Sequence, residues 1–338
     1  MIKIQENIQL KSYTTLRVGG EARYFAVAKN EDDLRELFAF AKGRKLPIFI
    51  LGGGSNILAP DHGFHGLIIK NELKGIKFTD QVDNKVILEV GAGEVLDDVI
   101  VLAILRKLSG LENLSGIPGT IGGAAVQNAG AYGAELSECL VSVEGLRLDN
   151  GKKFVFKKSD CQYGYRDSFF KKNKKYVITN LTLELSKNMD FKLNYAGLKN
   201  LLTGKKNINI EAIRQAVLQI RAEKLPDWHK VGTAGSFFKN PIISTEKFNE
   251  LKENYPDLPG FTEPKDKIKV SLAWVLDNVC HLKGYRVQDV GLYDKQPIVL
   301  VNYGKTTAME VINFADQIKN NVNKKIGIQI EEEVEKII

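Results

Sequence analysis

Six polar residues stand in local sequences unusual enough to suggest chemistry: Arg166, Tyr195, Lys224, Ser236, Asn240 and Glu333. Each is a weak sign alone, because a serine after a glycine is usually a turn residue and an arginine between tyrosines usually stacks on the surface. No nucleophile elbow or phosphate-binding lysine loop accompanies them. The four histidines are scattered without ligand-like partners, so we expect no metal: His62, His65, His229 and His281.

Two glycine-rich stretches without charge point to a cofactor. Leu111–Glu135 carries six glycines and no charge between its two glutamates, and Ile50–Asn56 reads ILGGGSN. One such run is usually a loop packed on itself. Two in one chain favour a large, anionic, planar cofactor held by main-chain N–H groups. From the residues alone, we predict a flavin- or nucleotide-binding protein.

The elements around the first stretch argue against a Rossmann fold. A strand over Tyr24–Val27, a helix capped by Asn30 and a strand over Ile48–Leu51 lead into the glycines. The dinucleotide fingerprint needs G-x-G-x-x-G opening a helix, whereas Ile57-Leu-Ala-Pro60 closes this turn. The cofactor loop is therefore of another kind.

Further along, strands alternate with helices and turns. We expect a strand over Val86–Val90 and a helix over Leu96–Leu108, with Gly110 at its end. Later elements include strands 141–148, 154–156, 176–185 and 298–302, helices after Asn209 and Ser244 and over 271–281, a Thr307 capping box, and a C-terminal strand 328–334. Residues 225–235 read as an irregular connector between domains.

Size and composition set outer limits on the function. At 338 residues, two or three subdomains are expected. The three cysteines lie far apart, which predicts reduced thiols and a cytoplasmic protein; no signal or membrane-spanning segment is expected. The net charge of +7 suits either nucleic acid or small anions. Because no basic stripe with interleaved aromatics occurs, we expect no nucleic-acid partner.

Five motifs then occur together and in order: LGGGSN (51–56), IPG to NAGAYG (117–133), GYRDS (164–168), KLP (224–226) and AGSFFKNP (234–241). This series resembles the UDP-N-acetylenolpyruvoylglucosamine reductase family, flavoenzymes of peptidoglycan precursor synthesis. The match covers about Ser12 to Glu333. Asn194-Tyr195 and the insert after Asn240 are similar to the longer, first subtype, in which a tyrosine-bearing loop covers the substrate.

The resemblance implies an α+β fold. A FAD-binding domain of the vanillyl-alcohol-oxidase (PCMH) type in two parts would be joined to a separate α/β substrate-binding domain. The implied boundaries are 1–74 with 326–338 for the first FAD subdomain, 75–226 for the second, and 227–325 for the substrate domain.

The resemblance also implies which backbone holds the FAD pyrophosphate. Both glycine stretches would contribute N–H groups. The implied residues are Gly52, Gly53, Gly54, Ser55, Asn56, Gly116, Ile117, Pro118, Gly119, Thr120, Gly122, Gly123, Ala124, Asn128 and Gly130.

The implied reaction is a ping-pong reduction of UDP-N-acetylglucosamine enolpyruvate to UDP-N-acetylmuramate by NADPH through FAD, by a monomer. Hydride reaches the methylene carbon, so negative charge grows on the substrate carboxylate. Arg166 would bind that carboxylate with its planar fork, Glu333 would orient or polarise the same end, and Ser236 would donate the proton to the ether-bearing carbon.

The substrate diphosphate and uridine need positive charge and donors. The implied set is Lys224, Asn240, Tyr195, Tyr132, Arg221 and, near uridine, Gln296. The tail departs from the family, which often carries a basic residue two places after its glutamate, whereas Glu335 stands there here. Three consecutive glutamates also make the choice of Glu333 depend on the valine that follows.

Two other functions remain open at this stage. A flavin oxidase of the same structural class would consume oxygen and often carries a histidine or cysteine for covalent flavin attachment; no histidine lies in either glycine stretch. A non-catalytic anion- or nucleic-acid-binding protein would be colourless when purified.

Overall fold

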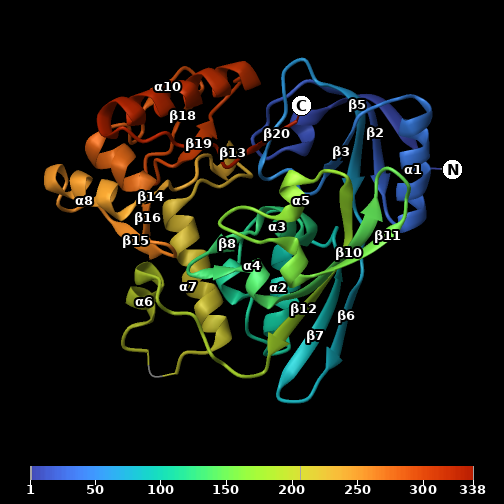
Figure 1. Cartoon of the computed structure of the whole chain (residues 1–338), viewed down its shortest axis with the longest axis horizontal. Coiled ribbons are helices and arrows are strands. Elements are labelled where there is room, and N and C mark those ends of the chain that lie inside the picture. The colour runs from blue at the N-terminus through green and yellow to red at the C-terminus, as the bar shows by residue number, and fades with distance from the viewer. Residues whose placement is uncertain (1, 206, 338) are drawn as a thin grey trace. The chain divides into compact units, whose positions relative to one another are not determined.

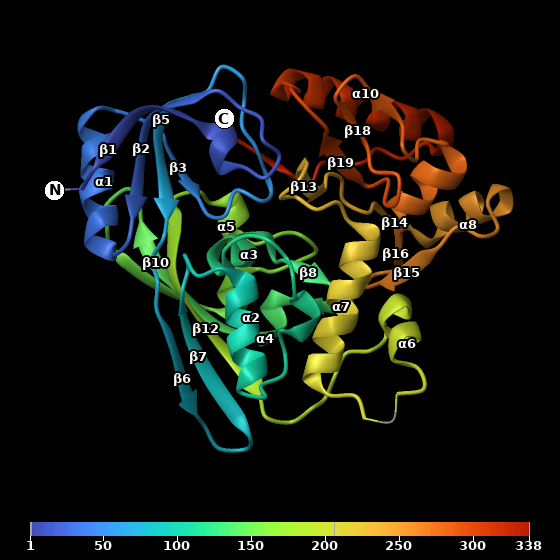
Figure 2. The ribbon, with the colours of Figure 1, turned by 180° about the vertical axis from the view of Figure 1, so that it is seen from behind.

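The computed structural model describes residues 2–205 and 207–337, and the chain forms two compact units (Figures 1 and 2). Unit 1 comprises Met1–Ile8, Ala22–Gly54 and His65–Ala222. Unit 2 comprises Gln9–Glu21, Ser55–Phe64 and Glu223–Ile338. Residues 326–338 thus group with 55–64 and with the C-terminal part of the chain. The three-part division expected from the resemblance is finer than this one and stays a prediction.

The first sheet of unit 1 has four strands in the order β1 (Ile4–Gln9), β2 (Glu21–Ala28), β5 (Phe64–Asn71) and β3 (Ile48–Leu51). Helix α1 (Glu31–Gly43) buries Leu34 and Leu37 in a core shared with Leu67 of β5. The Asn30 side chain accepts the Asp33 N–H at 2.8 Å, which confirms the predicted cap. Such a cap stabilises a helix by about 1 kcal/mol. β3 pairs in parallel with β5 and then enters the first glycine stretch.

The second sheet of unit 1 is antiparallel, in the order β11 (Lys153–Lys157), β10 (Leu140–Arg147), β12 (Tyr176–Ser186), β7 (Lys85–Gly91) and β6 (Ile76–Asp80). Alternate residues of β12, Leu181 and Leu183 among them, enter a core with Val99 and Ile100 of α2 (Leu96–Leu105). The same unit holds η2 (Glu112–Leu114), α3 (Ile121–Gln127), β8 (Gly130–Ala131), β9 (Ala134–Glu135), α4 (Leu136–Cys139), η3 (Lys158–Cys161) and α5 (Phe169–Lys172).

Two helices that lie side by side have a small core of their own (Figures 1 and 2). These are α6 (Ala196–Leu202) and α7 (Ile210–Lys224). Leu198 and Leu202 pack on Ile213, Val217 and Ile220, separately from the core under the second sheet. The predicted cap Asn209 accepts the Ala212 N–H at 2.8 Å.

Unit 2 is built on β13 (Gly232–Ser236), β19 (Val299–Asn302), β18 (Val290–Leu292) and β17 (Arg286–Val287), in that order. The predicted Thr307 capping box is present and opens α10 (Ala308–Ile326), which buries Phe314 against this sheet's core. The remaining elements are η1 (Leu10–Tyr13), β4 (Ile57–Leu58), β14 (Ile242–Ser244), α8 (Thr245–Asn254), β15 (Gly260–Glu263), β16 (Lys267–Val270), α9 (Leu272–Trp274), the π-helical turn η4 (Val275–Val279) and β20 (Glu335–Lys336).

Two helix predictions are too long. The helix expected over 96–108 ends at Leu105 because Lys107 takes a left-handed φ of 56° and the Leu108 N–H bonds the Ala103 carbonyl. The helix expected over 271–281 is three residues of α-helix followed by a π-helical turn that ends at Val279.

Two predictions in unit 2 are also wrong. The strand expected over 328–334 is extended chain that makes one isolated bridge, between Glu332 and Phe238, and the regular pairing comes later, where β20 runs parallel to β4. Its buried Ile328 and Ile330 still alternate with exposed residues, which is why the pattern resembled a strand. The connector expected over 225–235 ends early, since β13 begins at Gly232.

Candidate functional site

The two glycine stretches come into direct contact within unit 1. A Cβ on Gly53 would lie 2.5 Å from the Gly119 Cα, and one on Gly52 would lie 2.7 Å from the Thr120 hydroxyl oxygen. At Gly53 the close atoms are backbone, so a side chain there would push the two stretches apart, whereas a side chain at Gly52 would displace the Thr120 hydroxyl. Glycine is needed here because backbone packs on backbone.

Buried polar groups hold the second stretch in shape. The Glu112 carboxylate is buried and accepts the Gly110 N–H at 2.6 Å, and the Ser115 hydroxyl donates to the Glu112 carbonyl at 2.6 Å. Burial raises the pKa of Glu112, although the backbone N–H groups around its carboxylate oppose that shift. Thr120 then caps α3 by accepting the Gly123 N–H at 3.3 Å.

Asn128 ends α3 in the left-handed region, at φ 49°, and is fully buried. Its amide nitrogen donates to Glu135 at 2.8 Å and to the Gly164 carbonyl at 2.9 Å, while its amide oxygen accepts the Ser137 N–H. The side chain therefore joins the glycine stretch to the GYRDS loop. Asn128 would therefore affect a bound cofactor indirectly, by holding the backbone of the glycine stretch in place.

The contacting loops suit an anionic, planar cofactor. Among the described residues, no acceptor receives the N–H groups of Gly53, Gly54 or Gly119. Gly123 also has room, since a Cβ there would meet only the Thr120 hydroxyl, at 3.5 Å. Uncharged loops with unpaired N–H groups match the donor set that the pyrophosphate of FAD requires.

Arg166 is tied to the far end of the second stretch. Its guanidinium donates to the Gly130 carbonyl and, at 3.5 Å, to the Asn128 carbonyl. The residue itself has a left-handed φ of 52° inside a loop closed by two hydrogen bonds between Gly164 and Asp167. Its guanidinium also lies 5.3 Å from the Tyr165 ring centre. Stacking on a neighbouring tyrosine is thus present, but backbone bonds set the arginine's direction.

Three predicted substrate residues of unit 1 meet one another. The rings of Tyr132 and Tyr195 form an edge-to-face pair with centres 5.1 Å apart, and Arg221 hydrogen-bonds the Tyr132 hydroxyl. Burial raises the pKa of Tyr132, and the Arg221 charge opposes that change. Burial also lowers the pKa of Arg221, opposed by Tyr132 and Asp97. A cation that has already lost much of its hydration is well suited to an anionic ligand.

In unit 2, a β-bulge presents Ser236. The pairing of β13 with β19 shifts register between Thr233 and Ser236, and Gly235 within the bulge has φ +74°. The Thr233 hydroxyl stabilises the bulge by donating to the Leu300 carbonyl at 2.9 Å and accepting the Gly235 N–H at 3.1 Å. Bulges redirect the next side chain, and this one precedes Ser236 directly.

The C-terminal segment brings Glu333 next to this strand. The Glu333 N–H donates to the Phe237 carbonyl at 2.8 Å, so Glu333 lies opposite the residue that follows Ser236. Asn56 holds the same segment through two hydrogen bonds. Its side-chain amide donates to the Glu333 backbone carbonyl at 3.2 Å, and its backbone carbonyl accepts the Glu335 N–H at 3.0 Å. The structure thus brings two predicted catalytic residues of unit 2 together.

The two neighbouring glutamates have identifiable structural partners. Glu331 pairs with Lys239 at 2.9 Å, and Glu332 pairs with Lys319 at 2.9 Å and Lys336 at 2.7 Å. The pairs with Lys239 and Lys319 tie the tail to other segments of unit 2, and the pair with Lys336 lies within the tail. Glu333 bonds the Phe237 carbonyl, directly after Ser236, whereas the Glu331 carbonyl accepts the Lys239 N–H, two residues further along the chain.

The other predicted substrate residues of unit 2 are more dispersed. Asn240 accepts the Leu272 N–H at 3.0 Å at the start of α9, Lys224 is the exposed last residue of α7, and Gln296 lies in the turn before β19. Asn240 therefore has a structural role beside its predicted one.

Sequence reasoning missed two residues of unit 1. Arg214 grips the Asp97 carboxylate with two hydrogen bonds, at 2.7 and 2.8 Å, and the same carboxylate accepts the Gly116 N–H at 2.6 Å. An aspartate in the first turn of a helix is an ordinary helix-start signal, and nothing in the sequence connects it with an arginine 117 positions later.

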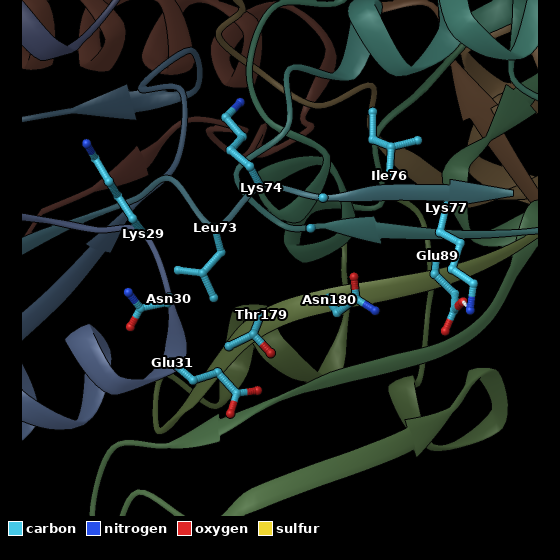
Figure 3. Close-up of a pocket in the computed structure, with 12 residues that line it drawn as sticks. Lys29, Asn30, Glu31, Leu73, Lys74, Ile76, Lys77, Glu89, Thr179 and Asn180 are labelled. Atoms are coloured by element: carbon cyan, nitrogen blue, oxygen red, sulfur yellow. Dashed lines mark ion pairs between the residues drawn. The ribbon is translucent and has the colours of Figure 1, made fainter.

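A groove of about 580 Å³ in unit 1 lies apart from these residues (Figure 3). None of the predicted site residues is among the described residues that line it. Two of its lysines already have carboxylate partners: Lys77 pairs with Glu89 at 3.0 Å, and Lys74 pairs with Glu94 at 3.2 Å. We assign it no role in the chemistry.

Known proteins resemble the whole chain. A family model described as "FAD binding domain" matches residues 22–155, and one described as "UDP-N-acetylenolpyruvoylglucosamine reductase, C-terminal domain" matches residues 227–337. The UDP-N-acetylenolpyruvoylglucosamine reductase of Amoebophilus asiaticus is 38% identical over 335 residues, which cover 98% of each chain. This chain belongs to that reductase family. The reductase of Bacteroides fragilis is 35% identical over 333 residues, covering 98% of this chain and 99% of the relative.

A solved structure supports the same fold. The crystal structure of the UDP-N-acetylenolpyruvylglucosamine reductase from Thermus caldophilus aligns over 100% of both chains with a TM-score of 0.70 at 24% identity. The predicted fold class is confirmed: a PCMH-type FAD-binding domain is joined to the C-terminal domain of the reductase family. The predicted cofactor, FAD, and the enzyme class, an FAD-dependent oxidoreductase, are also confirmed. The tyrosine-loop subtype stays a prediction.

Two features are absent from the described residues, 2–205 and 207–337. No helix there combines the length and apolar character that a membrane crossing requires. No group of three or more histidine, cysteine or acidic side chains is arranged there to hold a metal ion.

Proposed function

We propose that this chain reduces UDP-N-acetylglucosamine enolpyruvate to UDP-N-acetylmuramate with NADPH, as a cytoplasmic, monomeric enzyme of peptidoglycan precursor synthesis. The name of the relatives and their coverage of the chain support the substrate. The observation that carries the proposal is the Ser236–Glu333 arrangement, in which a proton donor and an acid of the matched motifs lie on hydrogen-bonded backbone segments.

The two glycine loops would hold the cofactor. The N–H groups of Gly53, Gly54 and Gly119 would donate to the pyrophosphate, and the backbone contact between the loops would keep those donors in place. A FAD held there would supply the hydride, drawn from NADPH, that the methylene carbon of the enolpyruvyl group receives.

Arg166 and Glu333 would act at the substrate carboxylate. Hydride addition to the methylene carbon breaks the C=C π bond and leaves an electron pair that spreads into the carboxylate. A planar guanidinium held in one direction can accept that charge through two hydrogen bonds without reorganising. Arg166 meets this need because the Gly130 and Asn128 carbonyls already fix its guanidinium. Glu333 would complete the carboxylate site as a hydrogen-bonding acid.

Ser236 would complete the reaction by protonating the ether-bearing carbon. Its Oγ–H bond breaks as the new C–H bond forms, and solvent returns a proton to the serine through neighbouring groups. A serine hydroxyl is a weak acid, but the receiving carbon is strongly basic. The net change is one hydride and one proton added across the double bond, with NADPH oxidised to NADP⁺.

The diphosphate and uridine would be bound by groups outside the reacting centre. Arg221, Tyr132 and Tyr195 would form one part, and Lys224, Asn240 and Gln296 another. The contact between Arg221 and Tyr132 supports this assignment because it gives the arginine a partner that holds no negative charge at neutral pH.

The visible spectrum of the purified protein tests the proposal. We expect a yellow protein with flavin absorption that NADPH bleaches anaerobically and that the enolpyruvyl substrate restores. A flavin oxidase would instead recover its colour with oxygen and ignore the substrate. A colourless protein that releases no flavin on denaturation would contradict the proposal.

A further inference from the structure

One carboxylate in unit 1 joins three elements, two of which carry residues that the proposed function uses. Asp97 lies in the first turn of α2, accepts the Gly116 N–H at 2.6 Å and forms a two-bond ion pair with Arg214 of α7. Only 16% of the Arg214 side chain and 29% of the Asp97 side chain are exposed. A bidentate, partly buried pair is stronger and more directional than a surface ion pair.

The same face of α7 continues this contact toward Arg221. Arg214, Leu218 and Arg221 are spaced four and three residues apart, so they form one stripe on the helix. A Cβ on Gly116 would lie 2.8 Å from Leu218 and 3.1 Å from the Arg221 Nε. The Gly116 backbone, at φ +73°, therefore sits between the Asp97 carboxylate and the Arg221 side chain.

The position of the α6–α7 pair depends on these polar contacts of α7. Its apolar residues form a core of their own, and Ile210 is the one buried α7 residue that belongs to the core beneath the second sheet. Outside the two helices, unit 1 meets this core through partly buried residues such as Tyr132 and Phe191. The directional bonds through Asp97 would then set the place of the helix and of Arg221 on it.

We propose that Asp97 is a positioning residue, which fixes Arg221 relative to the start of the FAD-binding loop by holding Arg214 and the Gly116 N–H at once. This inference rests on the proposed function, since it takes Arg221 as a ligand of the UDP moiety and Gly116 as part of the FAD cradle. The retained negative charge on Asp97 is consistent with it: burial acts to raise the pKa of this carboxyl, but Arg214 and the Gly116 N–H outweigh burial and lower it.

Replacing the two partners separately tests the inference. Asp97→Asn keeps an oxygen for the Gly116 N–H but loses the ion pair, and Arg214→Met loses the ion pair from the other side. We expect either change to raise the KM for the enolpyruvyl substrate about 10-fold, as the loss of a charge-assisted hydrogen bond would, with kcat within about 2-fold. The double variant should be no worse than either single variant. Arg214→Lys should recover part of the loss.

Asp97→Ala extends the test to the cofactor. It removes the acceptor of the Gly116 N–H as well, so FAD should dissociate about 10-fold more readily than from Asp97→Asn, by flavin fluorescence after dilution. Glu89→Gln is the matched control, because the exposed Lys77–Glu89 pair of the same unit has no link to either loop. It should change neither KM nor FAD affinity.

The outcomes distinguish a failure of the proposed function from a failure of the positioning role of Asp97. If the wild-type chain is active and the Asp97 and Arg214 variants lower only the melting temperature, as a merely structural pair would, the inference is overturned and the function stands. If the wild-type chain binds FAD but does not turn over the substrate, the proposed function fails. The FAD affinities of Asp97→Ala and Asp97→Asn then decide the role of Asp97, and equal affinities overturn it.

Discussion

The backbone around Gly53 and the backbone around Ser236 differ in how many of their N–H groups are hydrogen-bonded. Around Gly53, two loops pack backbone on backbone and leave N–H groups that no acceptor among residues 2–205 and 207–337 receives. Around Ser236, a bulge, a hydrogen bond to the tail and the two Asn56 hydrogen bonds pair the backbone and direct side chains. Holding an extended anionic cofactor takes many weak donors and hence many glycines. Moving one proton takes one side chain in a fixed place.

Removal of the Ser236 hydroxyl should give the largest effect on the reaction rate. It should affect the step at the substrate and leave the FAD-binding region around Gly53 unchanged. In Ser236→Ala we expect re-oxidation by the enolpyruvyl substrate to slow by about a hundred- to ten-thousand-fold, since a general acid contributes that much. FAD reduction by NADPH should be unchanged. Stopped-flow absorbance of each half-reaction measures the two rates, and two unchanged rates would remove Ser236 from the mechanism.

Gly53→Ala should disrupt the other region, the two glycine loops that would hold FAD. Its Cβ would stand 2.5 Å from the Gly119 backbone, which has no flexible side chain to move away. We expect a loss of about 2–4 kcal/mol in unfolding free energy, typical of a strained substitution, together with partial loss of FAD. The flavin-to-protein ratio and urea unfolding measure both.

Gly43→Ala is the matched control for that variant. Gly43 ends α1, and a Cβ there meets nothing within 4 Å. Its stability should stay within about 1 kcal/mol of the parent, and its FAD content should not change. Equal behaviour of the two alanine variants would show that the close approach of the loops is unnecessary.

The Asp97–Arg214 pair should make stability depend on pH in one direction. Because the folded pKa of Asp97 lies below its ordinary value of 3.8, its contribution is present above that pH and disappears as the pH falls through the folded value. Asp97→Asn should therefore lower the unfolding free energy by about 1–2 kcal/mol at pH 7. The gap should close in acid below about pH 4. Urea midpoints at pH 7 and in that range check this, and a constant gap would contradict it.

Replacing Tyr163 should give the smallest change in stability. It tests whether an unpaired polar group must be part of the cofactor site. Among the described residues, none hydrogen-bonds its buried hydroxyl, and the ring packs against the core of the second sheet. Burial raises the pKa of this phenol. Tyr163→Phe should stabilise the chain by about 1 kcal/mol with FAD affinity unchanged, measured by thermal unfolding. If FAD binding weakens instead, the hydroxyl belongs with the unpaired N–H groups near Gly53.

Several local features could be predicted because neighbouring residues decide them. Asn30 and Thr307 cap their helices as expected, since a cap needs only a side-chain oxygen three residues before an N–H. The alternation of Ile328 and Ile330 was correct as a burial pattern but wrong as a strand. A strand also needs a continuous partner, and the chain opposite Glu332 provides a single bridge.

What the sequence determined by itself was the chemistry of the parts: glycine loops without charge and motifs in the family's order, which predict an arginine, a serine and a glutamate as the reactive set. Tertiary structure alone decided how those parts are held. The contact of Gly53 with Gly119, the bulge before Ser236 and the grip of Asp97 on Arg214 join residues that are distant in the chain or depend on a partner strand. Local sequence signals report helix caps and burial periodicity, whereas a long-range hydrogen bond has no local signature, so only the folded chain reveals it.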